Sequence, residues 1–232
     1  NGQMLSNSEY ILNLIDTPGH SDFSYEVSRA LVAVEGAVLL IDATQGIQAQ
    51  TLANLKSARA AGLSIIGAIN KIDLFRGEEK RLELLRKHIS TTLGIDKELI
   101  FFVSGKTGEG VDNLLVAVVE KMPSPKDPIS NSSARSGYAF GGQFLISNCG
   151  RALIFDSFYD NHKGVVASVR VFDGEIKRDD TISLIGTGAR SKVKEVGYFN
   201  PKLLPNPVLS AGEIGYVATG IKDPNKIHIG DT

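Results

Sequence analysis

The chain has 232 residues, of which 42% are hydrophobic and 22% are charged, and its formal net charge is −1. This composition is ordinary for a globular protein of one or two domains, and it excludes a protein that binds nucleic acid through its overall charge. The single cysteine, Cys149, excludes an internal disulfide framework, and the lack of an apolar run of roughly 20 residues predicts that there is no transmembrane segment.

The first part of the chain alternates short apolar runs with amphipathic segments. The runs that predict strands are residues 10–16, 36–43, 63–70 and 98–105. The segments whose apolar residues repeat with a helical period are residues 22–34, 48–61, 78–94 and 110–122. Gly94 is the expected C-cap of the third helix. Strands that alternate with helices predict an α/β fold with a parallel sheet covered on both faces.

The character of the sequence changes after residue 122. Residues 123–150 are rich in Pro, Ser and Gly without a regular period, which predicts a linker or an insertion. Residues 151–232 contain short strand-like runs separated by turn signals, which predict a small all-β barrel. Within them, Asp173-Gly174 is typical of a hairpin turn. We therefore predict a first domain over 1–122, a linker and a β-barrel domain.

Three of the predicted strands end in distinctive polar sequences. The sequence after the first strand is Asp16, Thr17, Pro18, Gly19 and His20, and the two later ones are Asn70, Lys71, Ile72 and Asp73, and Ser104, Gly105 and Lys106. Because ligands of open parallel sheets bind beyond the carboxyl ends of the strands, we expect the three sequences to meet. Their order and separation predict one nucleotide site assembled from successive loops.

The second sequence, NKID, has the chemistry to recognise guanine. The Asp73 carboxylate can accept both the ring N–H and the exocyclic amine of this base in a charge-assisted, bidentate contact. Adenine lacks that pair of donors and would leave a desolvated carboxylate without a partner. Asn70 would connect neighbouring loops, and the aliphatic part of Lys71 would lie over the base with its charge near the ribose. The alternative is a solvated turn between a strand and a helix.

The third sequence, SGK, gains meaning from its place one strand and one helix after NKID. The Ser104 side chain and the Gly105 backbone N–H are expected to contact the oxygen of the base, and Lys106 to cover its ring. Taken alone, three such residues are more typical of an ordinary loop between a strand and a helix.

The first sequence, DTPGH, is suited to phosphate and metal. Asp16 would hold Mg²⁺ through water, and the Gly19 backbone N–H can approach a terminal phosphate because glycine has no side chain. Loss of that phosphate would release the following segment, as in an order–disorder switch. His20 is placed to orient the attacking water. The alternative is a Pro-Gly turn followed by a surface histidine.

Two further features have a simpler expected role. Asp42 ends a strand, and we give it no catalytic role. A stripe of basic residues in the β domain has the charge to contact RNA phosphate, but a solvated strand face is the favoured interpretation. Its members are Lys177, Arg178, Arg190, Lys192 and Lys194.

The three polar sequences resemble motifs of GTP-binding proteins, and IDTPGHSDFSYEVSRAL resembles the translational GTPases. The finer resemblance is to the LepA family, also called elongation factor four, and it rests on DATQGIQAQTLAN, NKIDL, VKEVGYFNPK and SAGEIGYVATGIKD. It implies a G domain of the phosphate-loop type followed by the barrel domain of translation factors. It also implies GTP or GDP and Mg²⁺ as cofactors, and His20 as the catalytic residue.

The same resemblance implies a ribosome-associated GTPase linked to tRNA positioning, back-translocation or ribosome assembly. The expected partners are ribosomal RNA and ribosomal proteins, with tRNA as an indirect partner, and the expected protein is a monomer. The implied location is the bacterial cytoplasm; peripheral membrane association and a mitochondrial or plastid matrix are alternatives.

The sequence departs from this family at one motif. The phosphate-loop pattern G-x-x-x-x-G-K-[ST] does not occur in the 232 residues. We interpret the chain as an internal fragment with an N-terminally truncated G domain, and we expect it alone to bind GTP poorly. The alternatives are another elongation factor with the same two domains and a ribosome-binding module that does not hydrolyse GTP.

Overall fold

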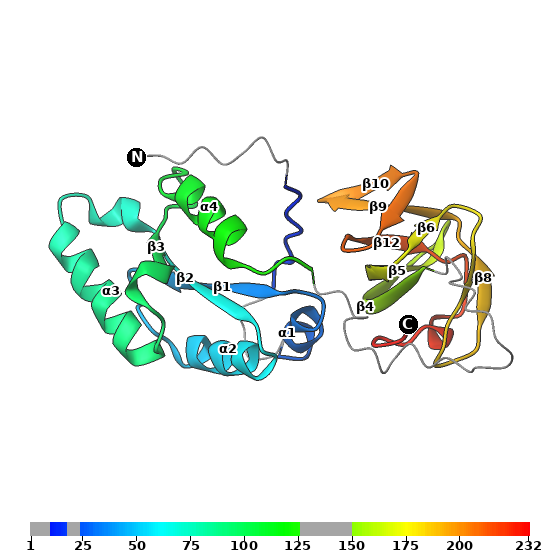
Figure 1. The fold of residues 1–232 in the computed structure, drawn as a ribbon, viewed down its shortest axis with the longest axis horizontal. Coiled ribbons are helices and arrows are strands. Elements are labelled where there is room, and N and C mark those ends of the chain that lie inside the picture. The colour runs from blue at the N-terminus through cyan, green and yellow to red at the C-terminus, as the bar shows by residue number, and fades with distance from the viewer. Residues whose placement is uncertain (1–9, 18–23, 126–149) are drawn as a thin grey trace, which may run out of the picture. The chain divides into compact units, whose positions relative to one another are not determined.

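The computed structural model describes residues 10–17, 24–125 and 150–232, with the side chains of 24–26 excepted (Figure 1). The chain divides into two compact units, Asn1–Ser124 and Pro125–Thr232. Within the described residues, no helix combines the length and the apolar character needed to cross a membrane.

The first unit contains a three-stranded parallel sheet with the order β1-β2-β3. Its strands are β1 (Gly36–Asp42), β2 (Ser64–Asn70) and β3 (Ile100–Phe102). Its α-helices are α1 (Ser24–Leu31), α2 (Ala49–Ala60), α3 (Glu79–Leu93) and α4 (Val111–Lys121), and its 3-10 helices are η2 (Ile72–Phe75) and η3 (Lys97–Leu99). Figure 1 shows α2 and α4 on opposite sides of the strands, so the α/β class predicted from the sequence is confirmed.

The core of this unit explains why these segments form strands and helices. Ile41, Ile69 and Ile100 come from the three strands and are almost completely buried against Ile89 and Leu93 of α3. β-Branched side chains suit strands because they pack well on a pleated, buried surface. The apolar residues of α3 recur at helical spacing, which gives the helix one face to bury.

The end of α3 matches the prediction. Gly94 has φ 59° and ψ 43°, the left-handed conformation that glycine adopts with little strain. The Arg59 guanidinium of α2 donates hydrogen bonds to the carbonyl oxygens of Leu93 and Gly94, at 2.6 and 2.9 Å. These bonds satisfy carbonyl groups that a helix end leaves without partners, and they connect α2 to α3.

The prediction that residues 10–16 form the first strand is wrong. Residues 10–17 have no regular secondary structure, and Ile11 and Leu14 are 72% and 90% exposed. A strand needs backbone partners on a neighbouring strand, and in the described sheet β1 pairs with β2 alone. The apolar, β-branched composition of this segment predicted a strand, but composition alone does not provide a neighbouring strand with which the segment can pair.

The second unit is built from antiparallel strands. They are β4 (Arg151–Asp160), β5 (Gly164–Asp173), β6 (Glu175–Lys177), β7 (Thr181–Ser183), β8 (Arg190–Lys192), β9 (Glu195–Asn200), β10 (Lys202–Asn206), β11 (Val208–Ser210) and β12 (Ile214–Ala218), followed by the 3-10 helix η4 (Pro224–Lys226). A five-stranded sheet has the order β10-β9-β12-β5-β4, and two-stranded sheets are formed by β11 with β6 and by β7 with β8. Buried Val171, Val193 and Leu209 belong to one apolar core, as expected for a small barrel-like all-β domain.

The hairpin predicted at Asp173-Gly174 is wrong. β5 ends at Asp173 and pairs with β4 and β12, whereas β6 begins at Glu175 and pairs with β11. Gly174 has φ 64°, so the chain bends there without reversing onto itself. The Asp-Gly sequence therefore passes the chain from one sheet to another.

Candidate functional site

The carboxyl ends of β1 and β2 and the loop after β3 lie at the same edge of the parallel sheet. Asp42, the last residue of β1, is directly opposite Asn70, the last residue of β2. The Val103 backbone N–H donates to the Ile69 carbonyl oxygen at 2.9 Å, which places Ser104 beside the end of β2. Two of the three predicted polar sequences therefore meet at this edge, together with Asp42.

Asn70 joins the two loops through its side chain. Its Oδ1 accepts a hydrogen bond from the Gly105 backbone N–H at 2.9 Å and another from the Lys71 backbone N–H at 2.8 Å. One amide oxygen thus fixes the loop that it begins and the loop that follows β3. This is the loop-connecting role predicted for Asn70, whereas its approach to a base stays a prediction.

Ser104 and Asp73 form the second connection between these loops. The Ser104 hydroxyl donates to Asp73 Oδ1 at 2.7 Å, and Ser104 is completely buried. The Thr107 backbone N–H donates to the same hydroxyl oxygen at 3.2 Å. We expected Ser104 to contact a base oxygen, but in this geometry its hydroxyl proton is used by Asp73. Ser104 therefore orients the carboxylate, which keeps acceptor capacity for further donors.

The Lys71 side chain lies against Asp42, an acid for which we expected no catalytic role. Lys71 Nζ is 2.7 Å from Asp42 Oδ2, and the other oxygen of Asp42 accepts from the Thr44 N–H at 2.8 Å and the Thr44 hydroxyl at 2.6 Å. The hydrogen bond from Lys71, followed by those from Thr44, lowers the pKa of Asp42 to about 2. Asp42 is therefore a carboxylate at neutral pH. Its position at the end of a parallel strand was the available sequence signal.

The other predicted site residues are less constrained. Ile72 is buried in the core, and the Lys106 side chain is exposed beside the edge of the sheet. Asp16 is exposed and Thr17 half-buried, in the segment that forms no strand. The remaining three, Pro18, Gly19 and His20, lie outside the described residues.

The basic stripe of the β unit contains its own counter-charges. Lys177 forms an ion pair with Glu175, and Arg178 Nε is 3.8 Å from a carboxylate oxygen of Asp179. The pairing with Glu175 raises the pKa of Lys177. Acids interleaved with the basic residues favour a solvated surface over a phosphate-binding patch.

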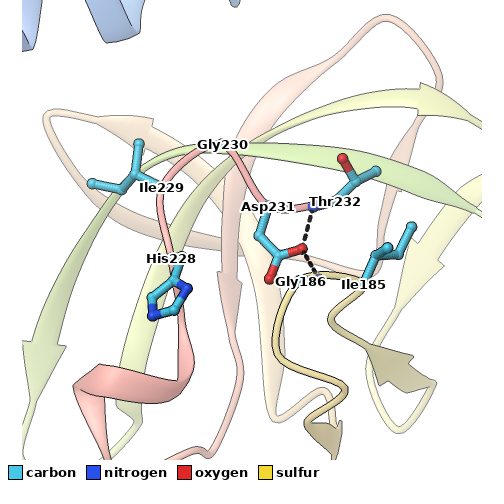
Figure 2. A pocket seen from close by; sticks show the side chains of 7 residues that line it. All are labelled: Ile185, Gly186, His228, Ile229, Gly230, Asp231 and Thr232. Atoms are coloured by element: carbon cyan, nitrogen blue, oxygen red, sulfur yellow. Dashed lines mark hydrogen bonds between the residues drawn. The ribbon is translucent and has the colours of Figure 1, made fainter.

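The β unit also has a cavity of about 380 Å³ near residues 185–186 and 228–232 (Figure 2). Asp231 is buried there, and its Oδ1 accepts hydrogen bonds from the backbone N–H groups of Gly186 at 2.7 Å and Thr232 at 2.8 Å. A Cβ added at Gly186 would lie 3.0 Å from Asp231 Oδ2. The carboxylate connects two segments of the backbone, and the small residue lets them approach.

This chain matches two protein-family models. The family "Elongation factor Tu GTP binding domain" matches residues 3–124, and "Elongation factor Tu domain 2" matches residues 164–232. Among curated proteins, elongation factor 4 from Aquifex aeolicus is 49% identical over 224 residues, which is 96% of this chain and 34% of that protein. Elongation factor 4 from Syntrophomonas wolfei is 44% identical over 224 residues, 97% of this chain and 34% of that protein. The resemblance predicted from the motifs is confirmed.

Solved structures show the same fold. A bacterial selenocysteine-specific elongation factor matches with a TM-score of 0.65 at 21% identity, over 92% of this chain and 34% of that one. SelB from Methanococcus maripaludis, in complex with the GTP analogue GPPNHP, matches with a TM-score of 0.62 at 20% identity, over 93% of this chain and 44% of that one. The chain spans about a third of the length of the curated relatives named above. On the match of residues 3–124, the chain belongs to the elongation factor Tu GTP-binding domain family.

Proposed function

We propose that this chain is the guanine-binding part of a ribosome-associated translational GTPase of the elongation factor 4 type. The observation that carries the proposal is the pair of connections between the loops after β2 and β3. Asn70 holds Gly105, and Ser104 holds Asp73. These hydrogen bonds orient a carboxylate at the carboxyl edge of a parallel sheet, where ligands of such sheets bind.

Asp73 gives this site its base selectivity. Guanine presents a ring N–H and an exocyclic amine side by side, and one carboxylate can accept both. Adenine would leave the carboxylate desolvated and without those donors. Because Ser104 already fixes the orientation of Asp73, little side-chain freedom is lost when the base binds. The site therefore favours GTP and GDP over ATP.

The phosphate side is proposed from the residues of DTPGH. The exposed Asp16 carboxylate is a hard oxygen ligand and would hold Mg²⁺, which proteins commonly bind through one or two carboxylates together with substrate phosphates. The bound Mg²⁺ would neutralise charge on those phosphates. Gly19 would offer its N–H to the terminal phosphate, and His20 would orient water for its attack. Hydrolysis further requires a phosphate loop, a motif that the 232 residues do not contain.

The proposed partners follow from the relatives named elongation factor 4. The protein acts as a monomer in the bacterial cytoplasm on ribosomal RNA and ribosomal proteins, and it affects tRNA indirectly. Its task on the ribosome is tRNA positioning, back-translocation or ribosome assembly. A ribosome-binding module without hydrolysis is the second candidate.

The test uses the full-length protein that contains this segment. Displacement of a fluorescent GDP analogue by GDP, GTP and ATP measures base selectivity, and phosphate release with and without ribosomes measures turnover. We expect GDP and GTP to compete at micromolar concentrations or below, ATP to compete at least about 100-fold more weakly, and ribosomes to stimulate hydrolysis. Equal competition by ATP would reject the guanine site. Binding without ribosome-stimulated hydrolysis would favour the second candidate.

A further inference from the structure

We infer that Asp42 is a positioning residue that holds Lys71 in its nucleotide-binding orientation. The inference rests on the proposed function, because it concerns how the same guanine site is prepared. Three observations support it: the fixed carboxylate of Asp42, the unusual backbone of Lys71, and the low structural value of an ion pair at this place.

Contacts other than the one with Lys71 fix the position of the Asp42 carboxylate. Asp42 ends β1 opposite Asn70, and the Gly46 backbone N–H donates to its carbonyl oxygen at 2.8 Å. The N–H and hydroxyl of Thr44 both bind Oδ1, which leaves Oδ2 directed to Lys71. Side-chain hydrogen bonds to a neighbouring backbone N–H are the means by which Asp stabilises a turn. The acid therefore acts as a rigid acceptor at the edge of the sheet.

The Lys71 backbone has a left-handed conformation that residues other than glycine seldom adopt. It has φ 68° and ψ 32°, and among the described residues Asp179 is the only other non-glycine residue with positive φ. The Asn70 side chain accepts the Lys71 N–H and so supports this left-handed conformation. Such strained conformations gather at functional sites, where the surrounding structure determines them. The backbone conformation fixes the direction in which the Lys71 side chain leaves the chain, and Asp42 fixes the position of its Nζ.

The ion pair between Lys71 and Asp42 has little value for folding. Their side chains are 51% and 20% exposed, and ion pairs at such exposure contribute little to stability. A free lysine side chain, however, has many rotamers to lose when it binds a ligand. If the Lys71 side chain is already held before the nucleotide binds, less conformational entropy is lost on binding. The ion pair therefore increases nucleotide affinity rather than the stability of the fold.

The sign of the effect separates this role from simple electrostatics. A carboxylate near an anionic nucleotide repels it, so Asp42→Asn would strengthen binding if charge alone mattered. If Asp42 positions Lys71, the same substitution weakens binding. Titration of Asp42 does not complicate the comparison near neutral pH, because the facing groups, Lys71 and Thr44, keep it ionised.

The test is a double-mutant cycle on GDP affinity in the full-length protein, read by displacement of a fluorescent GDP analogue. We expect Asp42→Asn to weaken GDP binding about 5- to 10-fold and Lys71→Ala to weaken it further. The double variant should bind no more weakly than Lys71→Ala alone, because Asp42 acts through Lys71. Additive losses, tighter binding or unchanged binding by Asp42→Asn would each overturn the inference. Thr44→Val is a second variant if Asp42→Asn does not fold, with an expected 2- to 3-fold loss that also disappears in the Lys71→Ala background.

Controls separate this inference from the proposed function. Asp173→Asn removes a partner from the Arg151 ion pair in the other unit, whose side chains are 42% and 21% exposed, so it matches the exposure of the tested pair. It should leave GDP affinity unchanged. If the wild-type protein binds GDP selectively while the cycle is additive, the inference alone fails. If the wild-type protein does not select guanine, both the proposed function and the inference fail.

Discussion

The two sides of the proposed nucleotide site differ in how they are held. On the base side, the loops after β2 and β3 are joined by the side chains of Asn70 and Ser104. On the phosphate side, residues 10–17 expose apolar side chains and form no strand, although their composition predicts one. Strand composition is therefore insufficient where the described part of the sheet offers no neighbouring strand. Polar residues that end paired strands are positioned by the pairing itself.

The largest expected effect tests the phosphate side. His20→Ala in the full-length protein should lower ribosome-stimulated GTP hydrolysis at least about 100-fold, because an orienting group for the attacking water is lost. GDP affinity should change less than about 2-fold, since the base contacts remain. Single-turnover phosphate release and GDP displacement measure the two quantities. Equal turnover in the variant would remove His20 from the reaction.

The next effect tests the base side. Asp73→Asn should weaken GDP binding about 100-fold, because a charge-assisted, bidentate contact is lost. The amide can donate to the oxygen that xanthine carries in place of the guanine amine, so xanthosine nucleotides should bind better than guanosine nucleotides. Competition between the two nucleotides measures the exchange of preference. Asp96→Asn, at the opposite end of the sheet before β3, is the control and should preserve the guanine preference.

A smaller effect tests the packing that supports Ser104. Gly110 has φ 73°, and a Cβ there would lie 2.0 Å from the Phe102 carbonyl oxygen. Gly110→Ala should cost about 3 kcal/mol of unfolding free energy, because the backbone must shift. Gly108→Ala is the matched control, because it has φ 82° without a nearby atom and should cost about 1 kcal/mol. Hydrogen exchange over residues 100–121 measures both, and equal losses would exclude the steric explanation.

The smallest effect lies in the β unit and is independent of the nucleotide. Burial of Glu195 opposes its ionisation, but hydrogen bonds from Lys163 and Tyr216 outweigh this, so the pKa of Glu195 lies below its usual 4.5. The stabilisation is present above the unfolded pKa and is lost as the pH falls through the folded pKa. Glu195→Gln should lower the stability of the β unit by about 1 kcal/mol at neutral pH.

The pH dependence provides the check on Glu195. Urea denaturation, monitored by hydrogen exchange over residues 195–200 and 214–218, measures the stability of the β unit. This stability should fall less on acidification in Glu195→Gln than in the wild-type protein. Glu175→Gln is the control, because its ion pair with Lys177 is half exposed and should be worth little. Wild-type and Glu195→Gln curves with the same slope from neutral pH to well below pH 4.5 would contradict this expectation.

Between residues 24 and 122, the sequence was sufficient for the order of the strands and α-helices and for the meeting of NKID with SGK. Apolar periodicity and the rule for parallel sheets carry that information locally. The bend at Gly174 was missed because strand pairing, rather than the turn sequence, decides whether a hairpin forms. The contact of Ser104 with Asp73 and that of Lys71 with Asp42 depend on register and rotamer, which no local pattern specifies.

The most direct measurement for the central claim is a crystal structure of the full-length protein with GDP and Mg²⁺. The account predicts that both donors of the guanine edge lie about 3 Å from the Asp73 carboxylate, while the Ser104 hydroxyl still donates to Asp73. A nucleotide bound with its base away from Asp73, or with the loops after β2 and β3 separated, would contradict it.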